Sequence, residues 1–150
     1  MKEQTKRKVS AVSLPMQRQL PFGHSGRYFD LKSIFRRVNS KFFRNRLRGY
    51  KIVWGRPRRL RPVRYFVYGT IQEEDRIIRI HPLLDAAFVP EWFLEYVIFH
   101  EMLHAVVPDE KLVSGRRKVH TAAFQTREKK YRNYWRAQKW ESKNLALFLR

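Results

Sequence analysis

The chain has 150 residues, with 33 lysines and arginines against 13 aspartates and glutamates, which gives a formal net charge of +20. Such a charge attracts polyanions, and a hydrophobic content of 43% is enough to bury the core of one domain. There is no cysteine, which excludes disulfides, zinc ribbons and iron–sulfur clusters, so any metal must be held by His, Asp or Glu.

The first 27 residues are basic and polar without periodicity, and we expect residues 1–27 to be a flexible N-terminal arm. No stretch is apolar and long enough for a signal peptide or a membrane span. The sequence therefore predicts an intracellular, cytoplasmic protein without a membrane partner, associated with the nucleoid if it binds DNA. We expect a monomer.

An amphipathic helix is predicted to start after Asp30, a favourable N-cap, and to continue to Gly49. Its apolar side recurs at helical spacing, whereas the intervening arginines and lysines face solvent. The residues of the apolar side are Leu31, Ile34, Phe35, Val38 and Phe42.

Three short runs have the composition of strands, at 50–54, 64–71 and 76–80. The last two flank a polar turn at 72–75, and we expect all three to form a small antiparallel sheet. An arginine-rich loop broken by prolines, at 55–62, separates the first two runs.

A second helix is predicted from about Pro90, a residue favoured at the first helical position, and must end before Pro108. A third is predicted from about His120 to Trp140. The predicted fold class is α+β, with three main helices and a three-stranded antiparallel sheet.

The second predicted helix carries an H-E-x-x-H motif, formed by His100, Glu101 and His104. Residues four apart on a helix face the same way, so both imidazoles can bind one ion while Glu101 lies beside it. A zinc ion with three protein ligands keeps a position open for water, lowers the pKa of that water to roughly 7 and polarises a bound carbonyl. Glu101 would accept the proton of that water and pass it to the leaving amine.

The third ligand must come from elsewhere in the chain. Metzincins carry glycine at position 107 and histidine at position 110 of this numbering, and Val107 and Glu110 exclude that class. Gluzincins take a carboxylate from a later helix, which keeps Glu128 and Glu141 open.

His120 is the better candidate for the third ligand, because it stands at the predicted start of the next helix, one loop after the motif. Two other imidazoles compete with it. His24 lies in the predicted arm, and His81 precedes Pro82 at the end of a strand, where a surface or turn role fits better.

These residues resemble the SprT-like family of zinc metallopeptidases over roughly Phe29 to Trp135. The specific part of the resemblance is the motif continued by Ala105, with His120 three residues before Ala123-Phe124. Weaker matches are Asn39, Phe42-Phe43, Leu47, Ile52-Val53-Trp54, Gly69, Ile77 to Ile80 and Pro82-Leu83-Leu84.

The resemblance implies a zincin-type metallopeptidase fold, with Zn²⁺ held by His100, His104 and His120 and with Glu101 as the catalytic base. Characterised members of the family cleave proteins attached to DNA, and contact with DNA promotes their activity. The resemblance therefore implies a protein substrate and DNA, single-stranded DNA included, as partners, and the net charge agrees with this.

The metallopeptidase domain would span residues 28–141, followed by a short C-terminal tail at 142–150. Thr121 departs from the family, which usually has glycine after the third histidine, and the cysteine zinc ribbon of many bacterial relatives is missing. Tyr131 and Tyr134, on the helix after the third histidine, are candidates for stabilising the transition state.

Nucleic-acid contacts are predicted at two basic segments, where arginines can hold phosphates and neighbouring rings can stack on unpaired bases. The first consists of Arg56, Arg58, Arg59, Arg61 and Arg64 beside Trp54, Tyr65 and Tyr68, and the second of Arg116, Arg117 and Lys118. The alternative function is a catalytically inactive basic protein that binds nucleic acid and holds zinc only for structure.

Overall fold

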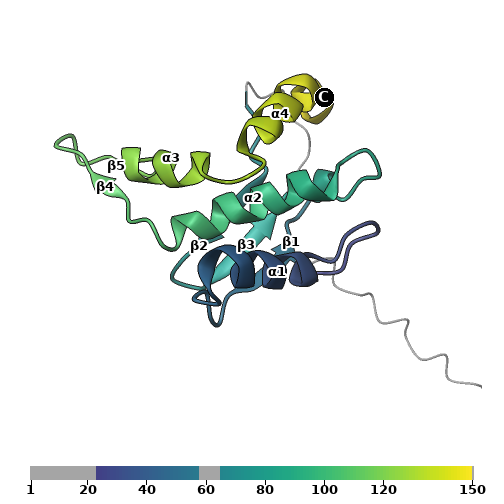
Figure 1. Cartoon of the computed structure of the whole chain (residues 1–150), viewed down its shortest axis with the longest axis horizontal. Helices are drawn as coiled ribbons and strands as arrows, with labels where there is room; N and C mark the ends of the chain where they lie inside the picture. Colours follow the sequence, from purple (N-terminus) through teal and green to yellow (C-terminus); the bar gives the residue numbers. More distant parts are fainter. Residues whose placement is uncertain (1–22, 58–64, 150) are drawn as a thin grey trace, which may run out of the picture.

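The computed structural model describes residues 23–57 and 65–149. In this part the chain forms an α+β structure with four α-helices and a three-stranded mixed sheet (Figure 1). The elements are α1 (Leu31–Phe43), β1 (Lys51–Trp54), β2 (Gly69–Gln72), β3 (Ile77–Ile80), the short 3₁₀ helix η1 (Pro82–Leu84), α2 (Glu91–His104), β4 (Glu110–Lys111), β5 (Arg117–Lys118), α3 (Ala122–Lys129) and α4 (Tyr134–Phe148).

The sheet has the strand order β1-β3-β2, and the prediction that it is wholly antiparallel is wrong. The short polar turn that joins β2 to β3 makes that pair antiparallel, as its length requires. β1 instead pairs in parallel with β3, from Lys51 opposite Ile77 to Trp54 opposite Ile80. Parallel neighbours need a long connection, and here the loop after β1 together with β2 supplies it.

One face of the sheet is buried and the other is exposed. Ile52, Trp54, Ile78 and Ile80 point to the buried face, whereas Arg79 between the last two is exposed. Helices α1 and α2 pack on the buried face (Figure 1). The alternation follows from the two-residue repeat of an extended chain, and it places the core between the sheet and these two helices.

Helix α1 begins as predicted, because the Asp30 carboxylate accepts a backbone hydrogen bond in the first turn at 3.1 Å. It ends at Phe43, six residues before the predicted end. Arg44 takes the left-handed conformation, with φ of 50°, and the Asn39 amide bonds both the carbonyl and the N–H of Leu47 at 3.1 and 3.3 Å. These hydrogen bonds from the Asn39 side chain take the place of backbone hydrogen bonds within the helix, so the chain turns towards β1.

Helix α2 lies at the centre of the fold (Figure 1). It contacts α1 and the sheet on one side and α3 and α4 on the other. Its buried residues are Phe93, Leu94, Tyr96, Val97, Ile98, Phe99, Glu101, Met102 and Leu103. No helix in the described part of the chain is long and apolar enough to cross a membrane.

The third predicted helix is in fact two helices, with a break between Lys129 and Tyr134. At the break Tyr131 is 5% exposed, and its ring centroid lies 5.0 Å from that of Phe42 and 4.5 Å from that of Phe99. We attribute the break to this packing, since burying a tyrosine ring between α1 and α2 offsets the helical hydrogen bonds lost there.

Helix α4 continues to Phe148, so the domain boundary predicted between residues 141 and 142 falls inside this helix. Phe148 is 2% exposed, and its ring lies 5.0 Å from Phe66 and 5.5 Å from Tyr68. The predicted tail therefore contributes to the core, because α4 needs this last turn to cover the aromatic residues before β2.

Residues 23–27 of the predicted arm are attached to the domain, and residues 1–22 lie outside the described part. His24 Nδ1 lies 2.7 Å from Asp30 Oδ1. The Asp85 carboxylate accepts hydrogen bonds from three consecutive backbone N–H groups that follow Gly26. A Cβ at Gly26 would lie 2.4 Å from that carboxylate, so only glycine permits this approach.

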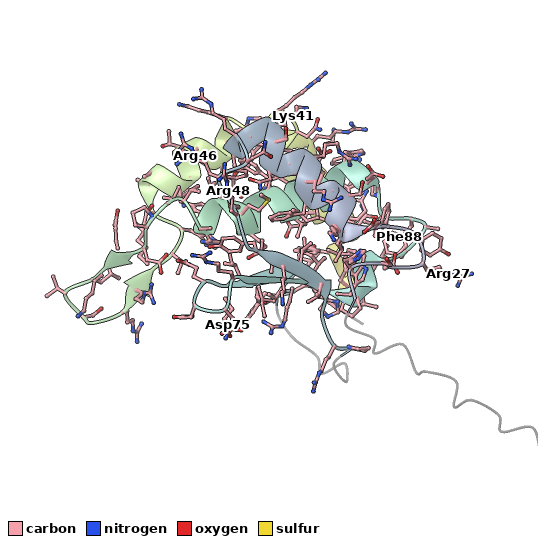
Figure 2. All side chains as sticks on the ribbon, turned by 90° about the horizontal axis from the view of Figure 1, so that it is seen from below. Arg27, Lys41, Arg46, Arg48, Asp75 and Phe88 are labelled. Atoms are coloured by element: carbon pink, nitrogen blue, oxygen red, sulfur yellow. The ribbon has the colours of Figure 1, made fainter. Side chains whose placement is uncertain are left out.

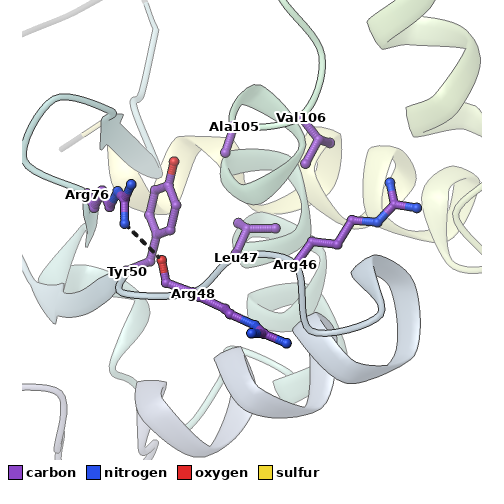
Figure 3. A pocket seen from close by; sticks show the side chains of 7 residues that line it. All are labelled: Arg46, Leu47, Arg48, Tyr50, Arg76, Ala105 and Val106. Atoms are coloured by element: carbon purple, nitrogen blue, oxygen red, sulfur yellow. Dashed lines mark hydrogen bonds between the residues drawn. The ribbon is translucent and has the colours of Figure 1, made fainter.

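Basic side chains extend from the surface around α1 and the loop after it, as Lys41, Arg46 and Arg48 show (Figure 2). Arg46, Arg48 and Arg76 also line a pocket of about 330 Å³ at the end of α2 (Figure 3). Arg76 donates to the carbonyl of Arg48 at 3.5 Å. Within the described residues none of these three guanidinium groups forms an ion pair with a carboxylate.

We predict that Phe148→Ala lowers the free energy of unfolding by about 3–5 kcal/mol, because it leaves a cavity among the aromatic residues that α4 covers. Leu147→Ala is the matched control. Leu147 is 45% exposed, and its substitution should change stability by less than about 0.5 kcal/mol. Urea unfolding followed by circular dichroism measures both, and equal effects would contradict a core role for the end of α4.

Candidate metal centre

Three imidazoles converge at the end of α2. His100 and His104 lie one helical turn apart, and His120 reaches the same point from the segment between β5 and α3. Its Nε2 atom lies 3.2 Å from Nε2 of His100 and 3.2 Å from Nε2 of His104. All three ligand atoms lie within 4.8 Å of one another, so these residues could hold a metal ion.

The donor set fits zinc. Tetrahedral zinc with Zn–N bonds of about 2.0 to 2.1 Å separates its ligand nitrogens by about 3.3 to 3.4 Å, and two of the observed separations, both 3.2 Å, are close to this. Three imidazoles leave a fourth position open, as catalytic zinc sites do, whereas structural zinc sites usually have four protein ligands. The geometry therefore brings together the three histidines that the sequence singled out.

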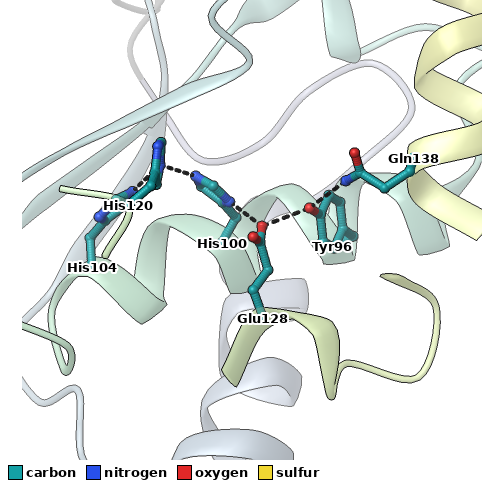
Figure 4. Close-up of polar contacts among 6 residues, drawn as sticks. All are labelled: Tyr96, His100, His104, His120, Glu128 and Gln138. Atoms are coloured by element: carbon teal, nitrogen blue, oxygen red, sulfur yellow. Dashed lines mark hydrogen bonds and ion pairs between the residues drawn. The ribbon is translucent and has the colours of Figure 1, made fainter. Parts of the chain in front are cut away.

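Glu128, on α3, supports His100 instead of joining the ligand set. Its Oε1 atom lies 2.6 Å from Nδ1 of His100 and accepts a hydrogen bond from the Tyr96 hydroxyl at 2.7 Å (Figure 4). The amide of Gln138 in turn donates to that hydroxyl at 2.9 Å. A carboxylate on Nδ1 fixes the imidazole with Nε2 directed at the metal, a support that sequence reasoning missed.

The ring of Phe124 packs against all three imidazoles. It is fully buried, and its ring centroid lies 4.4 Å from that of His104 and 5.0 to 5.1 Å from those of His120 and His100. Thr121 fixes the start of α3, because its hydroxyl accepts the backbone N–H of Phe124 at 3.1 Å. A threonine after the third histidine thus serves as a helix cap here.

Burial and neighbouring charges set the protonation of the histidines. Burial lowers the pKa of His104 to about 4, helped by the positive charges of His100 and His120. Burial likewise lowers the pKa of His120. It acts in the same direction on His100, but the hydrogen bond to Glu128 and the charge of Glu101 outweigh it and raise that pKa. The lowered pKa values of His104 and His120 favour the neutral imidazoles, whose free lone pairs a metal needs.

Glu101 is 6% exposed, and burial raises its pKa to about 7, opposed by the charge of His100. Among the described residues no hydrogen bond or ion pair reaches its carboxylate. It packs against Gly69 at the start of β2, where a Cβ would lie only 2.9 Å from its Cγ. The strand can approach the carboxylate this closely because it carries glycine at that point.

An open cleft of about 910 Å³ contains the three histidines and Glu101. Strand β2 forms one wall and the first half of α4 forms another. Tyr134 lines the cleft, whereas Tyr131 lies in the core. Glu141, which the sequence left open as a third metal ligand, also lines the cleft but makes no hydrogen bond to any of the three imidazoles.

The predicted nucleic-acid residues are only partly placed. Arg56 is exposed after β1, and Arg58, Arg59, Arg61 and Arg64 lie outside the described residues. Arg116, Arg117 and Lys118 are exposed on the β4–β5 hairpin, which projects from the domain beside α3 (Figure 1). Arg117 pairs there with Asp109 at 2.8 Å.

Comparison of the chain with protein-family models, curated proteins and solved structures finds no match in any of the three.

We predict that the protein binds one zinc ion and that His104→Ala and His120→Ala each abolish this binding. Glu128→Gln should weaken it by about 10- to 100-fold, because the imidazole of His100 loses its charged support. His24→Ala is the control, since His24 bonds Asp30 far from the cleft and should leave binding unchanged. Titration against a competing chelator measures these affinities, and full affinity in the His120 variant would contradict the site.

We predict that Glu101→Gln stabilises the metal-free protein at high pH. The pKa of Glu101 is about 7 when folded and 4.5 in the reference state, so burial of its charge costs stability as pH rises from 4.5 to 7. The advantage of the variant should grow by about 3 kcal/mol at most between pH 5 and 8. Urea unfolding in a chelator measures it, and the exposed Glu74→Gln should show no comparable trend.

Proposed function

We propose that this protein is a zinc-dependent metallopeptidase of the SprT-like type that acts on proteins bound to DNA. The observation that carries the proposal is the buried carboxylate of Glu101, which has no hydrogen-bond or ion-pair partner among the described residues and lies beside three converging imidazoles in an open cleft. A peptidase needs a metal site with a free position, a base next to it and room for a polypeptide, and these features supply all three.

The position of Glu101 favours catalysis over a structural zinc site. An unpaired buried carboxylate costs folding free energy, and it is retained where the chemistry needs it. A zinc ion held only for structure would be served by the imidazoles and Glu128, without Glu101. The raised pKa of Glu101 also suits a group that must accept and return a proton near neutral pH.

The roles of the side chains follow from their places. Zinc held by the histidines would activate water and polarise the substrate carbonyl. Glu101 accepts the proton of the attacking water and delivers it to the leaving amine. Glu128 holds His100 in orientation. Tyr134 is the candidate to donate a hydrogen bond to the developing oxyanion, because its ring lines the cleft and that of Tyr131 does not.

Two features support the zincin-type assignment. The motif helix α2 packs on the sheet next to its edge strand β2, and β2 lines the cleft along its length. The third histidine comes from the segment that returns to the motif helix after it ends. These agree with a helix pair beside a small sheet, as the resemblance implies.

The surface charge supports DNA as the partner that brings the enzyme to its substrate. Arg46, Arg48 and Arg76, none of which forms an ion pair within the described residues, line a pocket at the end of α2, next to Ala105 directly after His104. Arg116 and Lys118 extend from the hairpin that leads to His120. Phosphates held by either group would lie close to the ends of the metal-binding segments.

The test is cleavage of a DNA-bound protein by the zinc-loaded chain, with and without single-stranded DNA. We predict that Glu101→Gln keeps one zinc per chain and lowers the cleavage rate by at least about 100-fold, because the base is lost while the ligands remain. Asp75→Asn is the control, since this exposed turn residue does not line the cleft. Cleavage retained in Glu101→Gln would refute the mechanism, and salt-dependent DNA binding without any turnover would identify a nucleic-acid-binding protein with a structural zinc.

A further inference from the structure

The third imidazole of the candidate metal centre has less support than the first two. His100 and His104 belong to the largely buried helix α2, and the Glu128 carboxylate holds the ring of His100. His120 is exposed, and in the described part of the chain its ring contacts polar atoms only in the other two imidazoles. Metal-binding histidines usually have a polar support on their second ring nitrogen. The position of His120 must therefore come from the backbone on either side of it.

The backbone after His120 is fixed by packing, whereas the backbone before it is not. Thr121 is 1% exposed, and its hydroxyl caps α3. Residues 110–119, which form the β4–β5 hairpin and lead to His120, are all exposed. The two strands share only two residue pairs, Glu110 with Lys118 and Lys111 with Arg117. A two-stranded hairpin is marginally stable by itself, so the returning strand needs a further contact to stay in place.

The ion pair between Asp109 and Arg117 supplies this contact. Nη2 of Arg117 lies 2.8 Å from Oδ2 of Asp109. Among the described residues it is the one ion pair that joins residues 110–119 to the rest of the domain, and no other hydrogen bond joins them. The Asp109 side chain is 14% exposed, whereas that of Arg117 is 71% exposed. The pair therefore ties a strand of the projecting hairpin to a partly buried residue at its base.

Asp109 in turn is placed by the end of α2. Two residues before it, Val107 is 4% exposed, and its backbone N–H bonds back into the last turn of α2 at 3.0 Å. Arg117 stands three residues before His120, and Asp109, Arg117 and His120 all line the cleft. Burial lowers the pKa of His104 and of His120, and the charge of Asp109 opposes this in both, so its carboxylate lies near both rings. The ion pair thus connects the end of α2 with the strand that carries the third imidazole.

We propose that Asp109 and Arg117 form a positioning pair, which closes the base of the hairpin and holds His120 beside His100 and His104. Neither residue of the pair is a metal ligand or a catalytic residue. The inference rests on the metal centre of the proposed function and explains how a ligand carried by an exposed hairpin is held. It separates Arg117 from its neighbour Arg116, which forms no ion pair in the described part of the chain.

The test is the zinc affinity of the full chain, measured by competition with a chelator. Arg117→Gln should weaken zinc binding by about three- to tenfold, less than the loss of a group bonded to a ligand, because the pair is partly exposed and acts through the backbone. The sign is decisive, since removal of a positive charge from the cleft should by itself strengthen the binding of a cation. Arg116→Gln removes the same charge from the same hairpin and should not weaken binding. Arg117→Lys should keep most of the affinity, because it keeps a positive charge opposite Asp109.

A double-mutant cycle shows whether the two residues act through each other. Asp109→Asn should weaken zinc binding at least as much as Arg117→Gln does, since it also removes a negative charge near the imidazoles. In the Asp109→Asn background, Arg117→Gln should cause no further weakening. Additive weakening would overturn the pair, and so would an Arg117→Gln variant that binds zinc as tightly as the wild type or more tightly.

Hydrogen exchange of the metal-free protein separates a positioning role from a general loss of stability. The backbone N–H groups of Leu112 and Gly115, which bond within the hairpin, should exchange faster in Arg117→Gln, whereas those of α2 should not change. Faster exchange throughout α2 would overturn the positioning role. None of these measurements requires catalysis. Normal cleavage together with unchanged zinc affinity in Arg117→Gln would refute the pair alone, and the expected zinc affinities without cleavage of any DNA-bound protein would refute only the peptidase.

Discussion

The burial of most of the second half of α2 is the constraint on which the site depends. A helix packed between a sheet, α1, α3 and α4 has little room for polar residues, yet its second half carries His100, Glu101 and His104. Each of these polar side chains needs a hydrogen-bond partner or access to solvent. Glu128 is the partner of His100, and Glu101 and His104 reach the open cleft. The candidate metal centre thus takes the polar residues of the second half of α2, whereas Glu91 and Glu95 in its first half form ion pairs with Arg37.

The break between α3 and α4 determines what faces this opening. Burial of Tyr131 against α1 and α2 ends α3 at Lys129, one residue after Glu128, whose carboxylate contacts His100. It also redirects the chain, so that α4 presents Tyr134 and Glu141 to the cleft from a different direction. A continuous helix would have carried these residues away along the line of α3. The packing of the Tyr131 ring in the core therefore positions both Glu128, which contacts His100, and the part of α4 that lines the cleft.

The separation of charge reconciles a strongly basic protein with an acidic site. Arginines and lysines dominate the outer surface, where water screens their mutual repulsion, while six of the 13 aspartates and glutamates line the cleft. Inside such a region charges interact more strongly than on an open surface, because less water lies between them. The basic surface proposed to bind nucleic acid therefore lies mostly outside the cleft that contains the three histidines, although Arg117 lines that cleft.

By itself the sequence determined the features that depend on neighbours along the chain. These features are the spacing of His100 and His104, the Asp30 cap, the alternation of Ile78 and Ile80, and the β2–β3 turn. All are local, so they can be predicted directly from the sequence. His120 was found because an imidazole after the motif helix has few competitors in a chain with five histidines. Only the tertiary structure decided the parallel pairing of β1 with β3, the ring of Tyr131 that splits a predicted helix, and the place of Phe148 in the core. It alone placed Glu128 on His100 as a support instead of a metal ligand, and it placed Glu141 in the wall of the cleft. Each of these depends on contacts between segments 20 or more residues apart, whose free energy is set by packing and burial that no local pattern records.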